Sequence, residues 1–177
     1  MSAAIFQTVF KGFSCCVKLC HTLGATVEGE IGHVGQADGA DNDKLDLYTT
    51  VEEAQSYLAN TGVDALAIAI GTAHGKYLKK PKLDMDRLRS IRAAVDTPLV
   101  LHGGSGLSDD DFRNCVKNGI AKVNIFTDIC TAGEDAMRAC MNENMFYLDA
   151  RDKKVEAMKA VVKRKMELFG CVGHADD

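Results

Sequence analysis

The chain has 177 residues, of which 46% are apolar and 26% are charged, a composition typical of a globular protein with one ordinary core. Its formal net charge of -4 argues against nucleic acid as a main partner, and no apolar run approaches the roughly 20 residues that span a bilayer. The N-terminus lacks a basic start followed by an apolar signal core, so we expect a cytoplasmic protein with no membrane partner. The 7 cysteines form no Cys-x-x-Cys pair, which favours reduced thiols over a disulfide framework or a zinc knuckle.

Hydrophobic periodicity, capping residues and glycine stops predict an alternation of helices and strands. Helices are expected at residues 6–24, 49–62, 83–96, 107–119, 127–143 and 152–169. Strands are expected at residues 26–32, 64–71, 97–104 and 120–126, with loops at 33–48 and 72–82. This alternation predicts βαβ units and a parallel sheet in sequential order. The strands are apolar on both faces, which is typical of a sheet covered by helices.

Four strands are fewer than a complete α/β fold of the common types contains. A doubly wound sheet usually has five or six strands, and a (β/α)8 barrel needs about 250 residues. We therefore expect an α/β chain, one domain over residues 1–177, that represents part of a larger architecture.

Polar side chains follow each predicted strand at its carboxyl end, where parallel α/β folds place their chemistry. They are Glu28 and Glu30, His74 and Lys76, His102, and Asn124 with Thr127 and Asp128. Two neutral imidazoles at neighbouring strand ends, His74 and His102, can share a divalent metal ion. The HGGSG sequence at 102–106 precedes a helix, so its backbone amides, the Ser105 hydroxyl and the helix dipole predict a cradle for an anion.

Four motifs carry a resemblance to a known family. VEGEIGHVG at 27–35, GTAHGKY at 71–77, LVLHGGSGL at 99–107 and KVNIFTD at 122–128 occur in the order and spacing of the class II, metal-dependent ketose-bisphosphate aldolases. The chain resembles the C-terminal half of this family, whose members include fructose- and tagatose-bisphosphate aldolases. The family fold is a (β/α)8 TIM barrel, so the resemblance implies strands five to eight of that barrel with extra C-terminal helices.

The resemblance also implies roles for individual residues. His74 and His102 match zinc ligands of the family, and Glu30 matches a carboxylate that can ligate the metal in an alternate position; a monovalent cation is a second candidate cofactor. Asp38 is the nearest match to an acidic residue that takes part in proton transfer on the loop after the first strand. The residues that match the binding site for the dihydroxyacetone-phosphate half of the substrate are Gly75, Gly103, Ser105, Asn124 and Thr127, with Lys76 as a further electrostatic partner of the phosphate.

By resemblance, the reaction is the reversible cleavage of a ketose 1,6-bisphosphate into dihydroxyacetone phosphate and glyceraldehyde 3-phosphate. The family's third zinc histidine and its catalytic aspartate belong to the N-terminal half, and no Asp-His or Asp-x-x-His pair occurs here. Two alternatives therefore stay open: a truncated or split half-barrel, and a non-catalytic subunit that binds phosphate or metal without turnover. We expect the chain to form a homo-oligomer or to pair with a complementary half.

Two further residues have simpler interpretations. Glu28 is expected to be a structural hydrogen-bond partner rather than a metal ligand. His21, near the end of the first helix, is expected to interact with the helix dipole rather than to take part in chemistry.

Overall fold

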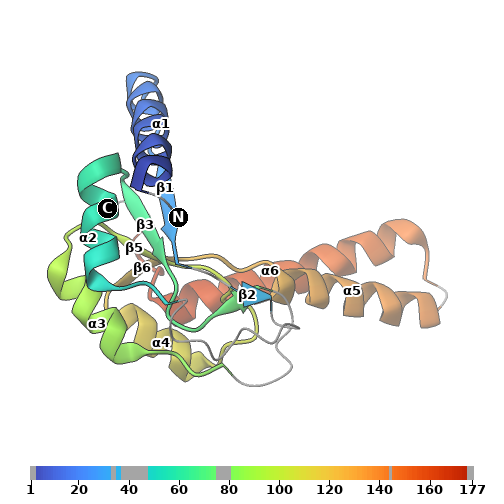
Figure 1. Cartoon of the computed structure of the whole chain (residues 1–177). Helices are drawn as coiled ribbons and strands as arrows, with labels where there is room; N and C mark the ends of the chain where they lie inside the picture. Colours follow the sequence, from blue (N-terminus) through green and yellow to red (C-terminus); the bar gives the residue numbers. More distant parts are fainter. Residues whose placement is uncertain (1–2, 33–34, 37–47, 75–80, 144, 175–177) are drawn as a thin grey trace.

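The computed structural model describes residues 3–32, 35–36, 48–74, 81–143 and 145–174 (Figure 1). Its helices are α1 (Ala3–Thr22), α2 (Val51–Thr61), α3 (Met85–Ala94), α4 (Asp109–Lys117), α5 (Thr127–Asn142) and α6 (Tyr147–Phe169). Its strands are β1 (Glu28–Ile31), β2 (Gly35–Gln36), β3 (Ala65–Ile68), β4 (Ala73–His74), β5 (Leu99–Leu101) and β6 (Ile120–Val123). The predicted order of the main helices and strands is therefore present.

The main sheet contains four strands in the order β1-β3-β5-β6, and every neighbouring pair is parallel. This confirms the predicted parallel sheet in sequential order. The register places Glu30 beside Ala67, Ala67 beside Val100, and Val100 beside Lys122, so these residues form one row across the sheet. A register shift between Leu99 and Val100 skips one residue of β6.

A second, two-stranded sheet joins segments that were expected to be loops. β2 pairs with β4 in parallel, with Gly35 beside Ala73 and Gln36 beside His74. A strand of two residues is too short to show an alternating pattern in the sequence, which explains why the prediction missed it. The pairing places the backbone of His74 next to the segment that follows β1.

Local capping explains where several helices begin. Thr50 and Glu53 form a capping box at the start of α2, and Ser108 and Asp111 form another at the start of α4. Helix α6 begins at Tyr147, five residues before the expected position of 152. Its N-cap residue, Phe146, makes no side-chain cap hydrogen bond, so the sequence carries no capping signal at that point.

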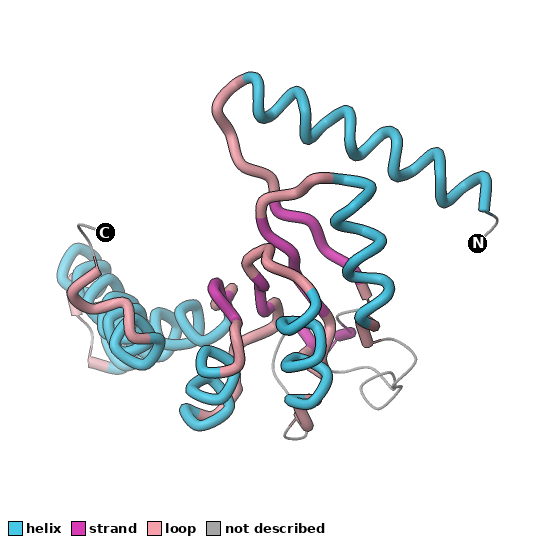
Figure 2. Tube along the Cα trace, turned by 90° about the vertical axis from the view of Figure 1, so that its left-hand side faces the viewer, coloured by secondary structure: helices cyan, strands magenta, loops and turns pink. Residues whose placement is uncertain are grey.

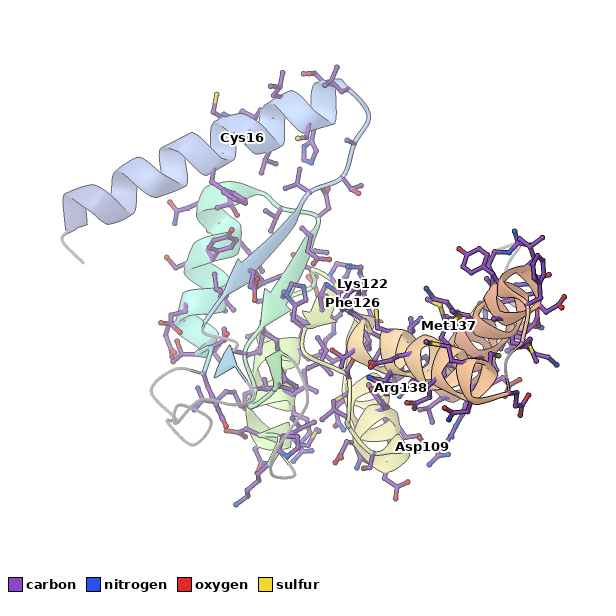
Figure 3. The ribbon with its side chains drawn as sticks, turned by 90° about the vertical axis from the view of Figure 1, so that its right-hand side faces the viewer. Cys16, Asp109, Lys122, Phe126, Met137 and Arg138 are labelled. Atoms are coloured by element: carbon purple, nitrogen blue, oxygen red, sulfur yellow. The ribbon has the colours of Figure 1, made fainter. Side chains whose placement is uncertain are left out.

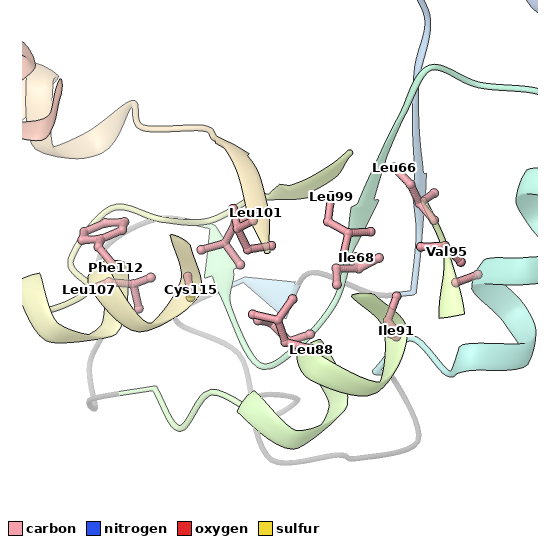
Figure 4. Close-up of a cluster of buried hydrophobic side chains, with 13 residues drawn as sticks. Leu66, Ile68, Leu88, Ile91, Val95, Leu99, Leu101, Leu107, Phe112 and Cys115 are labelled. Carbon is pink, nitrogen blue, oxygen red and sulfur yellow. The ribbon is translucent and has the colours of Figure 1, made fainter. Parts of the chain in front are cut away.

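One face of the main sheet packs against helices and forms the core (Figure 4). Leu66 and Ile68 of β3 are fully buried there, as are Leu99 and Leu101 of β5. They meet apolar side chains of α3 and α4, including Phe112. Fully burying a side chain of this size stabilises the fold by about 1.5–3 kcal/mol, so this face supplies most of the stability of the sheet.

The remaining helices lie at two sides of this core. Helix α1 packs on α2, where the Phe13 and Tyr57 ring centroids are 5.9 Å apart (Figure 2). Helices α5 and α6 pack against each other in a long hairpin that extends away from the sheet (Figure 1). The end of α6 returns to the core, where the Phe169 and Phe112 ring centroids are 5.2 Å apart. No helix in the described ranges is long and apolar enough to cross a membrane.

Candidate functional site

The other face of the main sheet carries charged and polar side chains. Successive residues of a strand point to opposite faces, so the alternate positions to the core residues share this second face. Its residues are Glu28 and Glu30 of β1, Ala65 and Ala67 of β3, Val100 and His102 at β5, and Lys122 and Asn124 at β6. The prediction that the strands are apolar on both faces is therefore wrong for β1 and β6.

Gly29 allows β1 to lie close to α2. A Cβ at this position would lie 2.6 Å from Cε1 and 2.7 Å from the hydroxyl of Tyr57, a side chain on α2. Only glycine fits between the strand and this ring without displacement. The glycine between Glu28 and Glu30 thus permits the position of β1 against α2, and β1 carries both carboxylates.

His102 follows β5 and lies between two carboxylates. Its side chain is 13% exposed, its Nε2 is 2.9 Å from Glu28 Oε1, and its Nδ1 is 3.2 Å from Glu30 Oε1. An ionised carboxylate only accepts hydrogen bonds, so the contact with Glu28 places a proton on Nε2. A hydrogen bond from Nδ1 to Glu30 likewise needs a proton on Nδ1, and a bound metal ion would take the place of that proton.

Glu28 also connects His102 to the opposite edge of the sheet. Lys122 Nζ donates hydrogen bonds to Glu28 Oε2 at 2.8 Å and to Asn124 Oδ1 at 2.8 Å. Burial raises the pKa of the Glu28 carboxyl, but the hydrogen bonds from Lys122 and His102 outweigh it and hold the pKa below the ordinary value of 4.5. Glu28 is therefore an ionised hydrogen-bond partner of both side chains, as the sequence predicted for its structural role.

A cleft of ≈ 360 Å³ opens beside this network, between the loop after β5 and the start of α5. It is lined by Gly103, Gly104, Ser105, Asn124, Ile125, Phe126 and Thr127. A Cβ on Gly104 would lie 2.9 Å from Val123 Cγ1, so glycine is needed for the loop to approach β6. Figure 3 shows Lys122 and Phe126 at the end of the sheet that leads into α5.

Ser105 joins the two segments that form the cleft. Its side-chain oxygen accepts hydrogen bonds from the backbone N–H groups of Phe126 and Asp128, both at 3.3 Å. Helix α5 has no cap from the side chain of its own N-cap residue, so Ser105 supplies that cap from the neighbouring loop. Lys165 of α6 lies 3.0 Å from Asp128 Oδ2 and balances the negative charge at this end of the cleft.

The structure brings several predicted site residues together. His102 contacts Glu30, and Gly103, Ser105, Asn124 and Thr127 line the same cleft. His74 belongs to β4, and the structure describes only its backbone. Asp38, Gly75 and Lys76 lie outside the described residues.

Lys122 is a residue of this network to which the sequence assigned no role. It lies two positions before Asn124 on an expected strand, and strand alternation therefore places both side chains on one face. The sequence therefore contains the signal that Lys122 and Asn124 share a face. It contains no signal for the contact between Lys122 and Glu28, because the two residues are 94 positions apart.

The described residues include candidate ligands for a metal ion but no complete ligand set. They contain no group of three or more His, Cys, Asp or Glu side chains that could hold a metal ion, and Glu28 and Glu30 contact different nitrogens of the His102 ring. Nδ1 of His102 and Oε1 of Glu30 do face each other at 3.2 Å. This is close to the distance of about 3.3 Å expected between two ligand atoms of a tetrahedral zinc ion. Glu28 on Nε2 has the position of the carboxylate that commonly supports a metal-bound histidine. Two ligands therefore fit a metal, and a third must come from elsewhere.

Parallel strands in sequential order, with polar groups at their carboxyl ends, are typical of the class of β/α barrels. Comparison with known proteins gives the family. A sequence model described as "Fructose-bisphosphate aldolase class-II" matches residues 2–174, and the chain belongs to this family.

Solved structures agree with this assignment. The YdjI aldolase from Escherichia coli K12 is 34% identical, with a TM-score of 0.79 over 94% of this chain and 57% of that protein. A protein from Coccidioides immitis, provisionally assigned as a fructose-1,6-biphosphate aldolase, is 29% identical, with a TM-score of 0.82 over 94% of this chain and 60% of its own. The fructose-bisphosphate aldolase of Campylobacter jejuni, 22% identical with a TM-score of 0.72 over 92% of this chain and 56% of its own, supports the fold. The chain thus spans less than two thirds of these relatives and corresponds to part of their barrel.

Proposed function

We propose that this chain provides the metal- and phosphate-binding part of a class II ketose-bisphosphate aldolase site. The reaction is the reversible cleavage of fructose or tagatose 1,6-bisphosphate to dihydroxyacetone phosphate and glyceraldehyde 3-phosphate. The observation that carries the proposal is the adjacency of two features: His102 and Glu30, which face each other at 3.2 Å, and the cleft lined by Gly103, Ser105, Asn124 and Thr127. Metal and phosphate are the two groups that such a reaction must hold side by side.

The residues divide the work of this site. His102 and Glu30 would hold a zinc ion, with His74 as the candidate third ligand; when bound, zinc acts as a Lewis acid toward the ketone oxygen. The glycine loop at Gly103 and the start of α5 at Thr127 line the cleft, and the positive end of the α5 dipole attracts a phosphate there. Phosphate binding fixes the substrate relative to His102, so binding energy remote from the reacting bond lowers the barrier.

The test is a coupled assay of triose-phosphate release. The purified protein is given fructose or tagatose 1,6-bisphosphate, with added Zn²⁺ or after treatment with a chelator. We expect at most weak release of triose phosphate from this chain alone, because the sequence has no Asp-His pair, and we expect that release to depend on zinc. Release that is unchanged by the chelator would contradict a metal-dependent reaction, and the ratio of the two rates assigns the preferred sugar.

A second candidate function is a subunit or half-barrel that binds phosphate or metal without turnover. It is favoured by the lack of an Asp-His or Asp-x-x-His pair in the sequence, because the resemblance places the catalytic aspartate of the family in such a pair. Binding of dihydroxyacetone phosphate with no triose release from either sugar would favour it over the first.

The sheet edges support a proposed partner. Within the described residues, β1 and β6 each have a strand on one side only, so each presents backbone groups for further pairing. We propose that a complementary half-barrel or a second copy of the chain pairs at these edges. Light scattering of the purified protein alone should give the mass of a dimer or larger assembly if the second copy is the partner.

A further inference from the structure

Lys122 occupies a position that connects two parts of the proposed site. Its ammonium donates to Glu28 Oε2 and to Asn124 Oδ1, each at 2.8 Å. Glu28 holds the Nε2 side of His102, and Asn124 lines the cleft. One side chain therefore contacts both a residue behind the proposed metal ligand and a residue of the proposed phosphate cleft.

The contact between Lys122 and Glu28 spans the whole main sheet. Strands β1 and β6 are its two edges, and three strand spacings of about 4.8 Å would separate them by about 14 Å in a flat sheet. The side chains of Lys122 and Glu28 meet across it on the face that a partial barrel turns inward, and we call this face the concave face. The side chains of β3 on the same face are Ala65 and Ala67, which leave room for Lys122 and Glu28 to meet above them.

The chemistry of the two groups determines how Asn124 is oriented. An ammonium group has three donors and no acceptor, so Asn124 must turn its amide oxygen toward Lys122. The amide NH₂ group then remains as a donor for a ligand in the cleft. A ligand oxygen, such as that of a phosphate or a ketone, is the matching partner for this donor.

We propose that Lys122 is a positioning residue that holds Glu28 against His102 and fixes the Asn124 amide with its NH₂ group toward the substrate. This inference rests on the proposed function for the identity of the ligands. The orientation of Asn124 itself does not depend on that function. Lys122 acts through its two neighbours and makes no contact of its own with the reacting atoms in this assignment.

The test compares Lys122→Met and Lys122→Arg with the wild-type protein, and uses Lys153→Met as a matched control on the exposed surface of α6. Lys122 is 54% exposed, so its replacement leaves the core intact, and circular dichroism checks the fold of each variant. The first measurement is the NMR signal of the Asn124 side-chain amide without any ligand. We expect one ordered pair of signals in the wild type and Lys153→Met, exchange broadening or doubling in Lys122→Met, and recovery in Lys122→Arg.

The second measurement is the affinity of each protein for Zn²⁺, by competition with a chromophoric chelator, and for dihydroxyacetone phosphate. We expect Lys122→Met to weaken zinc binding by about 3- to 10-fold, less than loss of a direct supporting partner does, and to weaken dihydroxyacetone-phosphate binding by about fivefold, the loss of one oriented hydrogen bond. Lys122→Arg should recover most of both affinities because it keeps the charge and the donors.

The outcomes separate the two proposals. An ordered Asn124 amide and wild-type affinities in Lys122→Met would overturn the positioning role. A wild-type protein that binds neither Zn²⁺ nor dihydroxyacetone phosphate would overturn the proposed function, while a disordered Asn124 amide in Lys122→Met would still support the role of Lys122 in orienting it.

Discussion

The two faces of the main sheet are built from the same strands and have opposite chemistry. On the helix-covered face, Leu66, Leu99 and Leu101 are fully buried in an apolar core. On the concave face, Glu28, His102 and Lys122 form a hydrogen-bonded network. His102 directly follows the core residue Leu101 in the sequence. Because neighbouring residues face opposite ways, stability and binding can be separated by substitutions only one residue apart.

The largest effect on stability is expected at Leu101. Leu101→Ala removes a fully buried side chain from the helix-covered face and should lower the free energy of unfolding by about 2–5 kcal/mol. Urea unfolding followed by circular dichroism measures this change. Leu23→Ala, at a position that is 78% exposed, is the control and should leave the unfolding midpoint unchanged. Equal midpoints for Leu101→Ala and the wild type would show that this face is not the core.

Substitution of His102, the residue after Leu101, is expected to affect zinc binding and to leave stability nearly unchanged. His102→Ala should weaken zinc binding by about 100-fold or more and change the free energy of unfolding by less than about 1 kcal/mol, because the side chain lies outside the apolar core. Chelator competition and urea unfolding measure the two quantities. His21→Ala is the matched control, since His21 pairs with Asp64 on the exposed surface. Unchanged zinc affinity in His102→Ala would remove His102 from the metal site.

Ser105 should show a smaller effect on both properties. Ser105→Ala removes the cap of α5 and should destabilise the protein by about 0.5–2 kcal/mol. It should also weaken dihydroxyacetone-phosphate binding by about fivefold, because Ser105 lines the cleft. Ser108→Ala removes the cap of α4 and serves as the control. Both variants should be destabilised, and loss of affinity in Ser108→Ala as well would mean that capping alone explains the result.

The smallest effect is expected at the N-cap of α3, away from the concave face. Burial raises the pKa of the Asp84 carboxyl, but hydrogen bonds from Arg87 outweigh it and hold the pKa below the ordinary value of 3.8. A carboxyl with a lowered folded-state pKa stabilises the fold above about pH 3.8, and this contribution is lost as the pH falls through the folded-state pKa. The advantage of the wild type over Asp84→Asn in urea unfolding should therefore shrink below about pH 4. An advantage of the wild type that grows on acidification would contradict the assignment.

The sequence predicted the features that depend on local patterns. Apolar runs such as residues 65–70 indicated the strands, and the Thr50–Glu53 capping box indicated the start of α2. His102 was correctly placed at a strand end because glycine follows it directly. The family resemblance extended this to the fold and is confirmed by the match over residues 2–174.

Features that depend on distant contacts were missed. The β2–β4 pair has two residues per strand and no period to detect, and α6 starts at Tyr147 after an N-cap residue, Phe146, that makes no side-chain cap hydrogen bond. The bond between Lys122 and Glu28 depends on the curvature of the sheet, which no local pattern encodes. His21 lies in the last turn of α1 as expected for a dipole interaction, but its bond to Asp64 at 2.8 Å again joins distant segments.

The most direct test of the concave face is a calorimetric titration of the wild-type protein with dihydroxyacetone phosphate, once with bound Zn²⁺ and once after removal of the metal. We expect zinc to tighten binding by about tenfold or more, because the ligands His102 and Glu30 lie beside the cleft that takes the phosphate. Equal affinities with and without zinc, or no binding in either state, would contradict a shared metal and phosphate site on this face.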